Sequence, residues 1–280
     1  MKSKIIRKTV ISILLLLYIS ITLMCRSNDS TFTREKRVYP SDIIPEIINW
    51  KLTLPVDQDG NDNSTEQNYK TRNNHALEIK NLKNFEYRPF FYMENNEVVF
   101  KAPCSGATSK NSKYPRSELR QLVGGGSNYW SVYKPQYLQV ELRVTHTPIN
   151  KPEICMTQIH GPVDEPLRVQ YNANKGLYIV WNEDNRIYFE DKVPYNLGQK
   201  LRITIDVAGG NIKFTIINLD TNKSFSYTWK SSDETGYFKV GCYTQSSIFL
   251  EQFKKGFENE PIDAYGEIRV SKIKLEETYN

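Results

Sequence analysis

The stretch Tyr-Phe-Lys-Val-Gly-Cys-Tyr-Thr-Gln at residues 237–245 decides the fold class. Its apolar and polar residues alternate with a period of two, which is typical of a β-strand that has one face in the protein core. The core face would carry Phe238, Val240, Cys242 and Thr244. The opposite face would carry Tyr237, Lys239, Gly241, Tyr243 and Gln245. Because phenol, ammonium and amide groups need partners when they are buried, we expect this face to bind a polar, anionic ligand, with Gly241 leaving room for the ligand to approach the backbone.

Other segments of the chain have the same strand-like character. They are separated by turn residues and lie at residues 50–55, 90–93, 97–101, 138–145, 176–181, 201–207, 212–217 and 266–275. No window of the sequence keeps a helical period over three turns. This pattern predicts an all-β protein, a jelly-roll sandwich of two antiparallel sheets. We expect Pro55 to end the first strand, because proline cannot donate a hydrogen bond to a neighbouring strand, and residues 57–74 to form a long polar loop.

The amino-terminal residues have the character of a targeting segment. Four Lys and Arg residues precede an apolar run over residues 10–24, which is short for a membrane span. We therefore expect a signal peptide or lipoprotein-type leader at residues 1–24, a flexible linker at residues 25–40 and one folded domain at residues 41–280. The protein is then secreted, periplasmic or held at the cell surface. Cleavage of the leader, lipidation at Cys25 and retention as a membrane anchor are all compatible with this sequence.

The charge balance excludes a general binder of polyanions. Removal of residues 1–24 takes away four positive charges and no negative ones, so the net charge falls from +5 to +1. Nucleic-acid binding needs a broad basic surface, so we expect no nucleic-acid partner, and an anionic ligand must be held at a local cationic site. Cys104, Cys155 and Cys242 lack metal-ligand spacing, so we expect no metal site, while their disulfide state stays open. We expect the protein to be a monomer.

Two further stretches place chemically useful side chains on one face of a strand. In the Arg-Ser-Glu-Leu-Arg motif at residues 116–120, the period of two puts the glutamate between two guanidinium groups. In the Gln-Ile-His motif at residues 158–160, the amide and the imidazole share a face, while Ile159 points into the core. Taken singly, each pattern is more often an ion-pair ladder or an ordinary solvent-facing strand. Their joint occurrence favours one shared site.

At these three stretches the sequence resembles polysaccharide lyase family 7, the alginate lyases. The motifs at residues 116–120, 158–160 and 237–245 look like the three signature motifs of that family, in the same order, and residues 50–55 are similar to its opening strand. The resemblance extends from roughly residue 50 to the carboxyl terminus and shows no departure at the motif positions. It implies that residues 41–280 are an alginate-lyase-like catalytic domain with a concave substrate cleft, the acidic polysaccharide alginate as partner and no obligatory cofactor.

The residue types at the motif positions suit β-elimination of a uronate, which needs an acidified C5 proton, a base and an acid for the departing O4 atom. Arg116 and Gln158 are candidate donors to the substrate carboxylate, where they would stabilise the developing charge. His160 is the candidate base, because its ordinary pKa of about 6.5 is near neutral pH, and Tyr243 is the candidate acid, because a phenol of pKa about 10 stays protonated. The resemblance implies the same roles. The candidate substrate-binding residues are Glu118, which would orient Arg116 and Arg120, together with Arg120, Tyr237, Lys239 and Gln245.

Rival functions predict different outcomes. A glycoside hydrolase needs two carboxylates on either side of the scissile bond, and the motif faces offer only Glu118. A non-catalytic uronate-binding module would use the same cationic face without making an unsaturated, ultraviolet-absorbing product. A lyase for another polyuronate, such as glucuronan, would use the same groups as an alginate lyase. The resemblance implies that isoleucine at position 159 goes with guluronate-containing blocks of alginate, whereas valine goes with mannuronate.

Overall fold

The computed structural model describes residues 37–58, 75–110, 112–126, 128–248 and 258–278. The strands all lie in one compact unit, Val38–Asn280. The predicted leader, Cys25, most of the predicted linker and most of the predicted polar loop lie outside the described residues. Within the described ranges, no helix is both long enough and apolar enough to cross a membrane.

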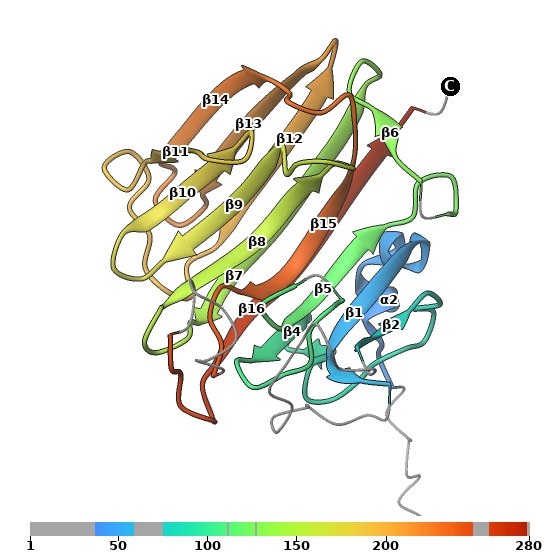
Figure 1. Cartoon of the computed structure of the whole chain (residues 1–280), viewed down its shortest axis with the longest axis vertical. Helices are drawn as coiled ribbons and strands as arrows, with labels where there is room; N and C mark the ends of the chain where they lie inside the picture. Colours follow the sequence, from blue (N-terminus) through green and yellow to red (C-terminus); the bar gives the residue numbers. More distant parts are fainter. Residues whose placement is uncertain (1–36, 59–74, 111, 127, 249–257, 279–280) are drawn as a thin grey trace, which may run out of the picture. The chain divides into compact units, whose positions relative to one another are not determined.

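Two antiparallel sheets make up most of the described chain (Figure 1). The first sheet has the strand order β11-β10-β9-β8-β15-β5-β1-β2, and β6 pairs with the start of β15. Its strands are β1 (Trp50–Asp57), β2 (Ala76–Ile79), β5 (Arg116–Gln121), β6 (Trp130–Ser131), β8 (Glu153–His160), β9 (Leu167–Asn172), β10 (Gly176–Trp181), β11 (Asn185–Tyr188) and β15 (Thr235–Thr244).

The second sheet has the strand order β14-β13-β12-β7-β16-β4-β3. Its strands are β3 (Phe91–Glu94), β4 (Glu97–Pro103), β7 (Gln136–His146), β12 (Leu201–Ala208), β13 (Asn211–Asn218), β14 (Ser224–Lys230) and β16 (Tyr265–Glu277). Two short helical segments precede β1, namely α2 (Pro40–Ile43) and the 3-10 helix η1 (Pro45–Asn49). The predicted jelly-roll sandwich of two antiparallel sheets is therefore confirmed.

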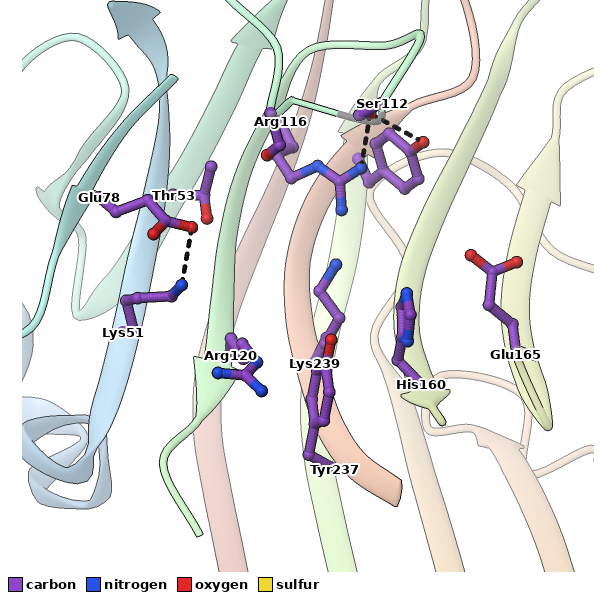
Figure 2. A pocket seen from close by; sticks show the side chains of 12 residues that line it. Lys51, Thr53, Glu78, Ser112, Arg116, Arg120, His160, Glu165, Tyr237 and Lys239 are labelled. Carbon is purple, nitrogen blue, oxygen red and sulfur yellow. Dashed lines mark hydrogen bonds and ion pairs between the residues drawn. The ribbon is translucent and has the colours of Figure 1, made fainter. Parts of the chain in front are cut away.

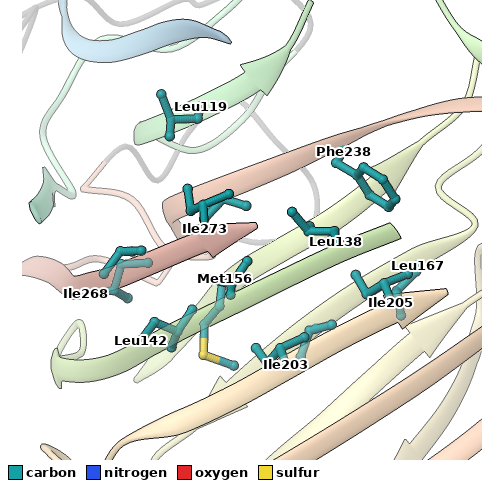
Figure 3. Close-up of a cluster of buried hydrophobic side chains, with 14 of the residues drawn as sticks. Leu119, Leu138, Leu142, Met156, Leu167, Ile203, Ile205, Phe238, Ile268 and Ile273 are labelled. Atoms are coloured by element: carbon teal, nitrogen blue, oxygen red, sulfur yellow. The ribbon is translucent and has the colours of Figure 1, made fainter. Parts of the chain in front are cut away.

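Alternating side chains fill the space between the sheets. On β15, Phe238, Val240 and Cys242 are fully buried, as the period of two predicted. They belong to the same hydrophobic cluster as Leu138 and Ile273 of the second sheet (Figure 3). Burial of a large apolar side chain contributes about 1.5–3 kcal/mol. A slip of β15 by one residue would bring its polar face into this cluster, so burial fixes the register of the strand.

Pro55 does not end the first strand, in contrast to our expectation. β1 continues through it to Asp57. The pairing of β1 with β5 stops at Thr53, and the register with β2 shifts between Thr53 and Asp57. The proline therefore lies where no neighbouring strand needs a backbone N–H group. Its carbonyl oxygen accepts a hydrogen bond from the N–H of Ala107.

The strand order brings the three motif strands together. β5, β15 and β8 are neighbours in the first sheet, although their residues are far apart in the sequence. Ile159 on β8 is fully buried in the core, as predicted, so the side chains on either side of it point to the opposite face. The polar faces of the three motifs thus form one continuous surface.

Candidate active site

The pairing of β5, β15 and β8 determines which motif residues lie beside one another. Directly opposed residues of antiparallel strands have their side chains on the same face, with Cβ atoms about 4.5–5.5 Å apart. The opposed pairs are Arg120 with Lys239, Lys239 with Gln158, Arg116 with Tyr243, and His160 with Tyr237. The register therefore gathers these seven predicted site residues at one place in the sheet.

A cavity of about 370 Å³ lies at this place (Figure 2). Six of the predicted site residues form part of its wall, namely Arg116, Arg120, His160, Tyr237, Lys239 and Tyr243. The remaining wall residues are Lys51, Thr53, Glu78, Ser109, Ser112 and Glu165. Four of the wall residues are Lys or Arg and two are Glu. The cavity is therefore a local cationic site, which favours an anionic ligand.

Glu118 is the buried centre of the site. Its side chain has no solvent exposure, and its Oε2 atom lies 2.8 Å from Nη1 of Arg116 and 2.5 Å from Nζ of Lys239. Its Oε1 atom accepts a hydrogen bond from Nε2 of Gln158. Burial would raise the pKa of Glu118, but the Lys239 ammonium and the Arg116 guanidinium outweigh burial and lower that pKa. One buried negative charge thus holds two cations and an amide in place.

Our expectation for the second cation at Glu118 is wrong. The carboxylate pairs with Arg116 and with Lys239 of the neighbouring strand, not with Arg120. Gly241 lies opposite Glu118 in the register, so no side chain of β15 stands over the carboxylate and the lysine can reach it. The guanidinium of Arg120 lies instead 4.0 Å from the ring centre of Tyr237, within the range of a cation–π interaction.

Gly241 is required by the neighbouring strand. Its φ angle is +155°, which residues with a side chain rarely adopt. A Cβ atom at this position would lie 2.4 Å from the carbonyl oxygen of Ser117 and 2.5 Å from Cα of Glu118. The expectation that this glycine leaves room for a ligand is therefore wrong, because the space beside it is filled by the backbone of β5.

His160 has the properties of a general base. Its Nδ1 atom lies 2.7 Å from the carbonyl oxygen of Gly161, which can only accept, so Nδ1 carries the proton. Its ring is stacked on Tyr237, with ring centres 5.3 Å apart and an angle of 7° between the planes. Burial and the Lys239 ammonium lower the pKa of His160 below its ordinary value of 6.5. The imidazole is therefore neutral near pH 7, with an unprotonated Nε2 atom.

Tyr243 has the properties of a general acid. The guanidinium carbon of Arg116 lies 3.6 Å from its ring centre. Its hydroxyl lies 3.2 Å from Oγ of Ser112, which also accepts a hydrogen bond of 2.7 Å from Nη2 of Arg116. Burial raises the pKa of Tyr243 above its ordinary value of 10.0, although Arg116 and Ser112 act in the opposite direction. The phenol therefore keeps its proton at neutral pH.

Gln158 and Gln245 are predicted site residues that do not line this cavity. Gln158 is fully buried and donates to Glu118, so it supports the carboxylate rather than reaching a ligand in the cavity. Gln245 follows the end of β15 and lines a second cavity, together with Gln170 and Tyr178. The alternation of polar and apolar residues is informative about the face of a strand, but not about what covers a side chain on that face.

Half of the wall residues were not predicted from the sequence. Lys51 and Thr53 alternate with fully buried leucines on β1, so the period of two carried a signal for both. Glu78 pairs with Lys51 at 2.7 Å from the adjacent strand β2. The other three wall residues are Ser109, Ser112 and Glu165, and they lie between strands. In such segments no periodicity indicates the direction of a side chain.

The described ranges contain no group of three or more His, Cys, Asp or Glu side chains placed to hold a metal ion. Cys104, Cys155 and Cys242 are buried free thiols. Burial raises the pKa of all three thiols, so they are neutral core residues rather than nucleophiles.

The arrangement as a whole is suited to proton transfer next to a carboxylate. It combines a neutral imidazole nitrogen at His160, a protonated phenol at Tyr243 and the cations of Arg116 and Lys239 at one cavity. A base of this kind can remove a proton, the cations can stabilise the negative charge that develops, and the phenol can protonate a departing oxygen atom.

Comparison with known proteins identifies the family. The family model described as alginate lyase matches residues 46–277, which include all three motif strands. This chain belongs to the alginate lyase family. It is therefore a polysaccharide lyase, and the resemblance at the three motifs is confirmed.

Individual alginate lyases support the family assignment. An alginate lyase of Klebsiella pneumoniae is 26% identical over 263 residues, covering 72% of this chain and 83% of the relative. The structure of alginate lyase AlgAT5 from polysaccharide lyase family 7 is 27% identical, with a TM-score of 0.67, and covers 86% of this chain and 100% of that chain. The alginate lyase structure from Corynebacterium sp. has a TM-score of 0.65 at 24% identity, covers 87% of this chain and 100% of that chain, and supports the fold.

Proposed function

We propose that this protein cleaves alginate by β-elimination and leaves a 4-deoxy unsaturated uronate at each new end. The observation that carries the proposal is the pairing of a neutral His160 and a protonated Tyr243 at one cationic cavity. The alginate-cleaving activity named for the relatives supports the substrate class.

Each step of the reaction has a candidate group in the cavity. Nε2 of His160 takes the C5 proton, and the electron pair of the broken C–H bond forms the C4–C5 double bond while the C4–O4 bond breaks. The hydroxyl of Tyr243 gives its proton to O4. Arg116 stabilises the negative charge that develops on the substrate carboxylate. Removal of one such donor typically lowers the rate by about 10²–10³-fold. Transfer of the proton from His160 to Tyr243 through solvent restores the starting state.

The buried interactions support this role for Arg116. Its Nε–H group has no hydrogen-bond partner among the described residues, while its two other nitrogens are held by Glu118 and Ser112. An unpaired buried donor costs about 1–3 kcal/mol. The approach of a carboxylate to this guanidinium would relieve part of that cost. In the proposal Gln158 orients Glu118, and Arg120 and Lys239 bind the substrate carboxylates.

The decisive experiment is an absorbance assay. Purified protein is mixed with alginate, and the ultraviolet absorbance of the unsaturated product is followed, with polyglucuronate as the control substrate. We expect absorbance to rise with alginate. A protein that binds alginate but never raises absorbance would be a binding module, and a protein that acts only on polyglucuronate would be a lyase for that other polyuronate.

In this proposal the preferred substrate is guluronate-containing alginate. This preference leads to a prediction for the variant His160→Ala. In guluronate the C5 proton and O4 lie on opposite faces of the ring, so the base and the acid must be separate groups. In mannuronate they share a face, and Tyr243 can serve as both. Ile159 lies in the core between Gln158 and His160, so its shape influences how His160 is presented.

His160→Ala should therefore suppress cleavage of polyguluronate more than any cleavage of polymannuronate. Initial rates on the two polymers, measured by absorbance, check this expectation. Equal losses on both polymers would make His160 a general binding group and would contradict the division of base and acid.

The cellular location is a second part of the proposal. The basic and apolar character of residues 1–24 supports export of the protein to the periplasm, the cell surface or the medium. Mass spectrometry of the protein isolated from its native host tests this. An intact, unmodified amino terminus on protein recovered from the cytoplasm would contradict export.

A further inference from the structure

A second cavity on the first sheet is not used by the proposed reaction. It has a volume of about 310 Å³ and lies over β8, β9, β10 and β11. It is lined by Lys151, Glu153, Arg168, Gln170, Lys175, Tyr178, Arg186, Tyr188 and Gln245. Four of these residues are cationic and one is acidic, so this cavity also favours an anionic ligand.

The strand register connects this cavity to the candidate active site. One row of directly opposed residues crosses seven strands, and it consists of Lys51, Arg120, Lys239, Gln158, Arg168, Val180 and Arg186. Directly opposed residues share a face, so both cavities open on the same side of the sheet. Four strand spacings separate Lys239 from Arg186, which corresponds to roughly 19 Å at about 4.8 Å per strand. A polymer that lies across the strands can therefore occupy both cavities.

The four cations of the second cavity differ in their ion-pair partners. Arg168 pairs with Glu165 at 3.3 Å, and Lys151 pairs with Glu258 at 3.3 Å. Lys175 and Arg186 are both exposed, and neither has an ion-pair partner among the described residues. Their charges are therefore available to a ligand.

The floor of the second cavity is polar and buried. Gln170 is only 2% exposed and is one of the residues that line the cavity. Its side-chain amide can both donate and accept hydrogen bonds, so it can pair with a hydroxyl or a carboxylate of a ligand in the cavity. Tyr178 and Tyr188 stack with ring centres 4.8 Å apart, and Tyr188 is 43% exposed. An exposed ring beside cations suits a sugar with an apolar face and a carboxylate.

The acidic wall residue is already engaged by the protein. Oε2 of Glu153 accepts a hydrogen bond of 3.0 Å from Nδ2 of Asn172, and its Oε1 atom lies 4.0 Å from Nζ of Lys151. Burial and the nearby Glu153 carboxylate raise the pKa of Tyr178, so its hydroxyl stays protonated beside that carboxylate. Glu153 therefore does not cancel the charges of Lys175 and Arg186.

We propose that this second cavity is a distal subsite, in which Lys175 and Arg186 bind the carboxylate of a uronate residue several sugars away from the cleaved bond. The inference rests on the proposed function, because it assumes a polyuronate substrate. It predicts that long substrates gain affinity from this end of the sheet and that short ones do not.

The test compares substrates of two lengths. Initial rates are measured by absorbance with an alginate trisaccharide and an alginate octasaccharide, for the wild type and for the double variant Lys175→Gln, Arg186→Gln. We expect KM for the octasaccharide to rise about tenfold, as for the loss of two exposed ion pairs, with kcat changed by less than about twofold. The trisaccharide, which is too short to reach both cavities, should show no change. The rise in KM should shrink in high salt, because salt screens exposed charges.

The matched control is the double variant Lys213→Gln, Lys223→Gln. It removes the same charge from exposed positions on and beside β13 of the second sheet, and it should leave both substrates unaffected. Equal losses on both lengths, or an unchanged KM for the octasaccharide, would overturn the distal subsite. Failure of the wild type to raise absorbance with any alginate would contradict the proposed function instead. In that case, calorimetry with the octasaccharide would compare its binding to the wild type and to the two double variants, and weaker binding by Lys175→Gln, Arg186→Gln alone would still support the subsite.

Discussion

Substitution of the buried carboxylate by an amide, Glu118→Gln, tests the central interaction of the site. The wild-type side chain has no solvent exposure and accepts from Arg116 at 2.8 Å, from Lys239 at 2.5 Å and from Gln158. The amide keeps the shape but removes the negative charge, so both cations remain buried without a counter-charge. Loss of one partner from a buried ion pair costs about 3–5 kcal/mol. At about 2–4 °C for each kcal/mol in a domain of this size, we expect Tm to fall by roughly 6–20 °C.

A second carboxylate at the same cavity provides the control. Glu78 pairs with Lys51 at 2.7 Å, but its side chain is 46% exposed. An exposed ion pair contributes only about 0.2–1 kcal/mol, so Glu78→Gln should change stability by no more than that. Urea unfolding followed by circular dichroism gives the free energy of unfolding of both variants. Equal costs for the two substitutions would refute the argument that burial makes Glu118 the centre of the site.

The pH dependence of stability provides an independent check on the same residue. Because the pKa of Glu118 is lower in the folded protein than its ordinary value of 4.5, its stabilising contribution is present above pH 4.5 and is lost as pH falls through the lowered pKa. The difference in unfolding free energy between the wild type and Glu118→Gln should therefore shrink below pH 4.5. A constant difference down to strongly acidic pH would mean that the charge of Glu118 does not account for the effect.

Three further predictions concern catalysis. Tyr243→Phe should reduce cleavage of polyguluronate and polymannuronate by at least about 10²-fold with an unchanged circular dichroism spectrum, and a smaller loss would remove the phenol from the role of general acid. In the proposed mechanism cleavage requires neutral His160, whose pKa is lowered below 6.5, so the decline of kcat/KM toward acidic pH should have its midpoint below pH 6.5; a midpoint above pH 6.5 would contradict this assignment. Treatment with EDTA should leave activity unchanged, since the described residues contain no cluster of metal ligands, and loss of activity that calcium restores would be the opposing result.

The sequence was sufficient to predict the layers of the fold, because burial leaves a direct trace in a strand. Phe238, Val240 and Cys242 alternate with polar residues, and a strand with this pattern has only one face that can enter a core. The same reasoning placed Ile159 in the core. The neighbourhood of the three motif strands in space does not follow from alternation. It was predicted from the joint occurrence of the three motifs and from the resemblance to a family.

The partner of Glu118 could not be predicted, because it depends on register. β15 pairs with β5 so that Lys239 lies opposite Arg120 and Gly241 lies opposite Glu118, and no local pattern in either strand indicates this pairing. This register, together with the glycine opposite the carboxylate, brings Lys239 to Glu118. Ser112 and Glu165 were not predicted for a different reason, because the segments between strands have no period from which the direction of a side chain can be inferred.

The charge of the buried network explains how a sheet can present a reactive polar face without losing stability. Arg116 and Lys239 carry two positive charges and Glu118 carries one negative charge, so the network has one positive charge in excess. Two buried cations without a counter-charge would repel each other and would be costly to desolvate, whereas a fully neutral network would have no electrostatic attraction for a uronate. A single carboxylate beneath two cations lies between these limits. In the proposed function, the substrate carboxylate would supply the missing negative charge, so ligand binding would complete an ion network that folding leaves one charge short.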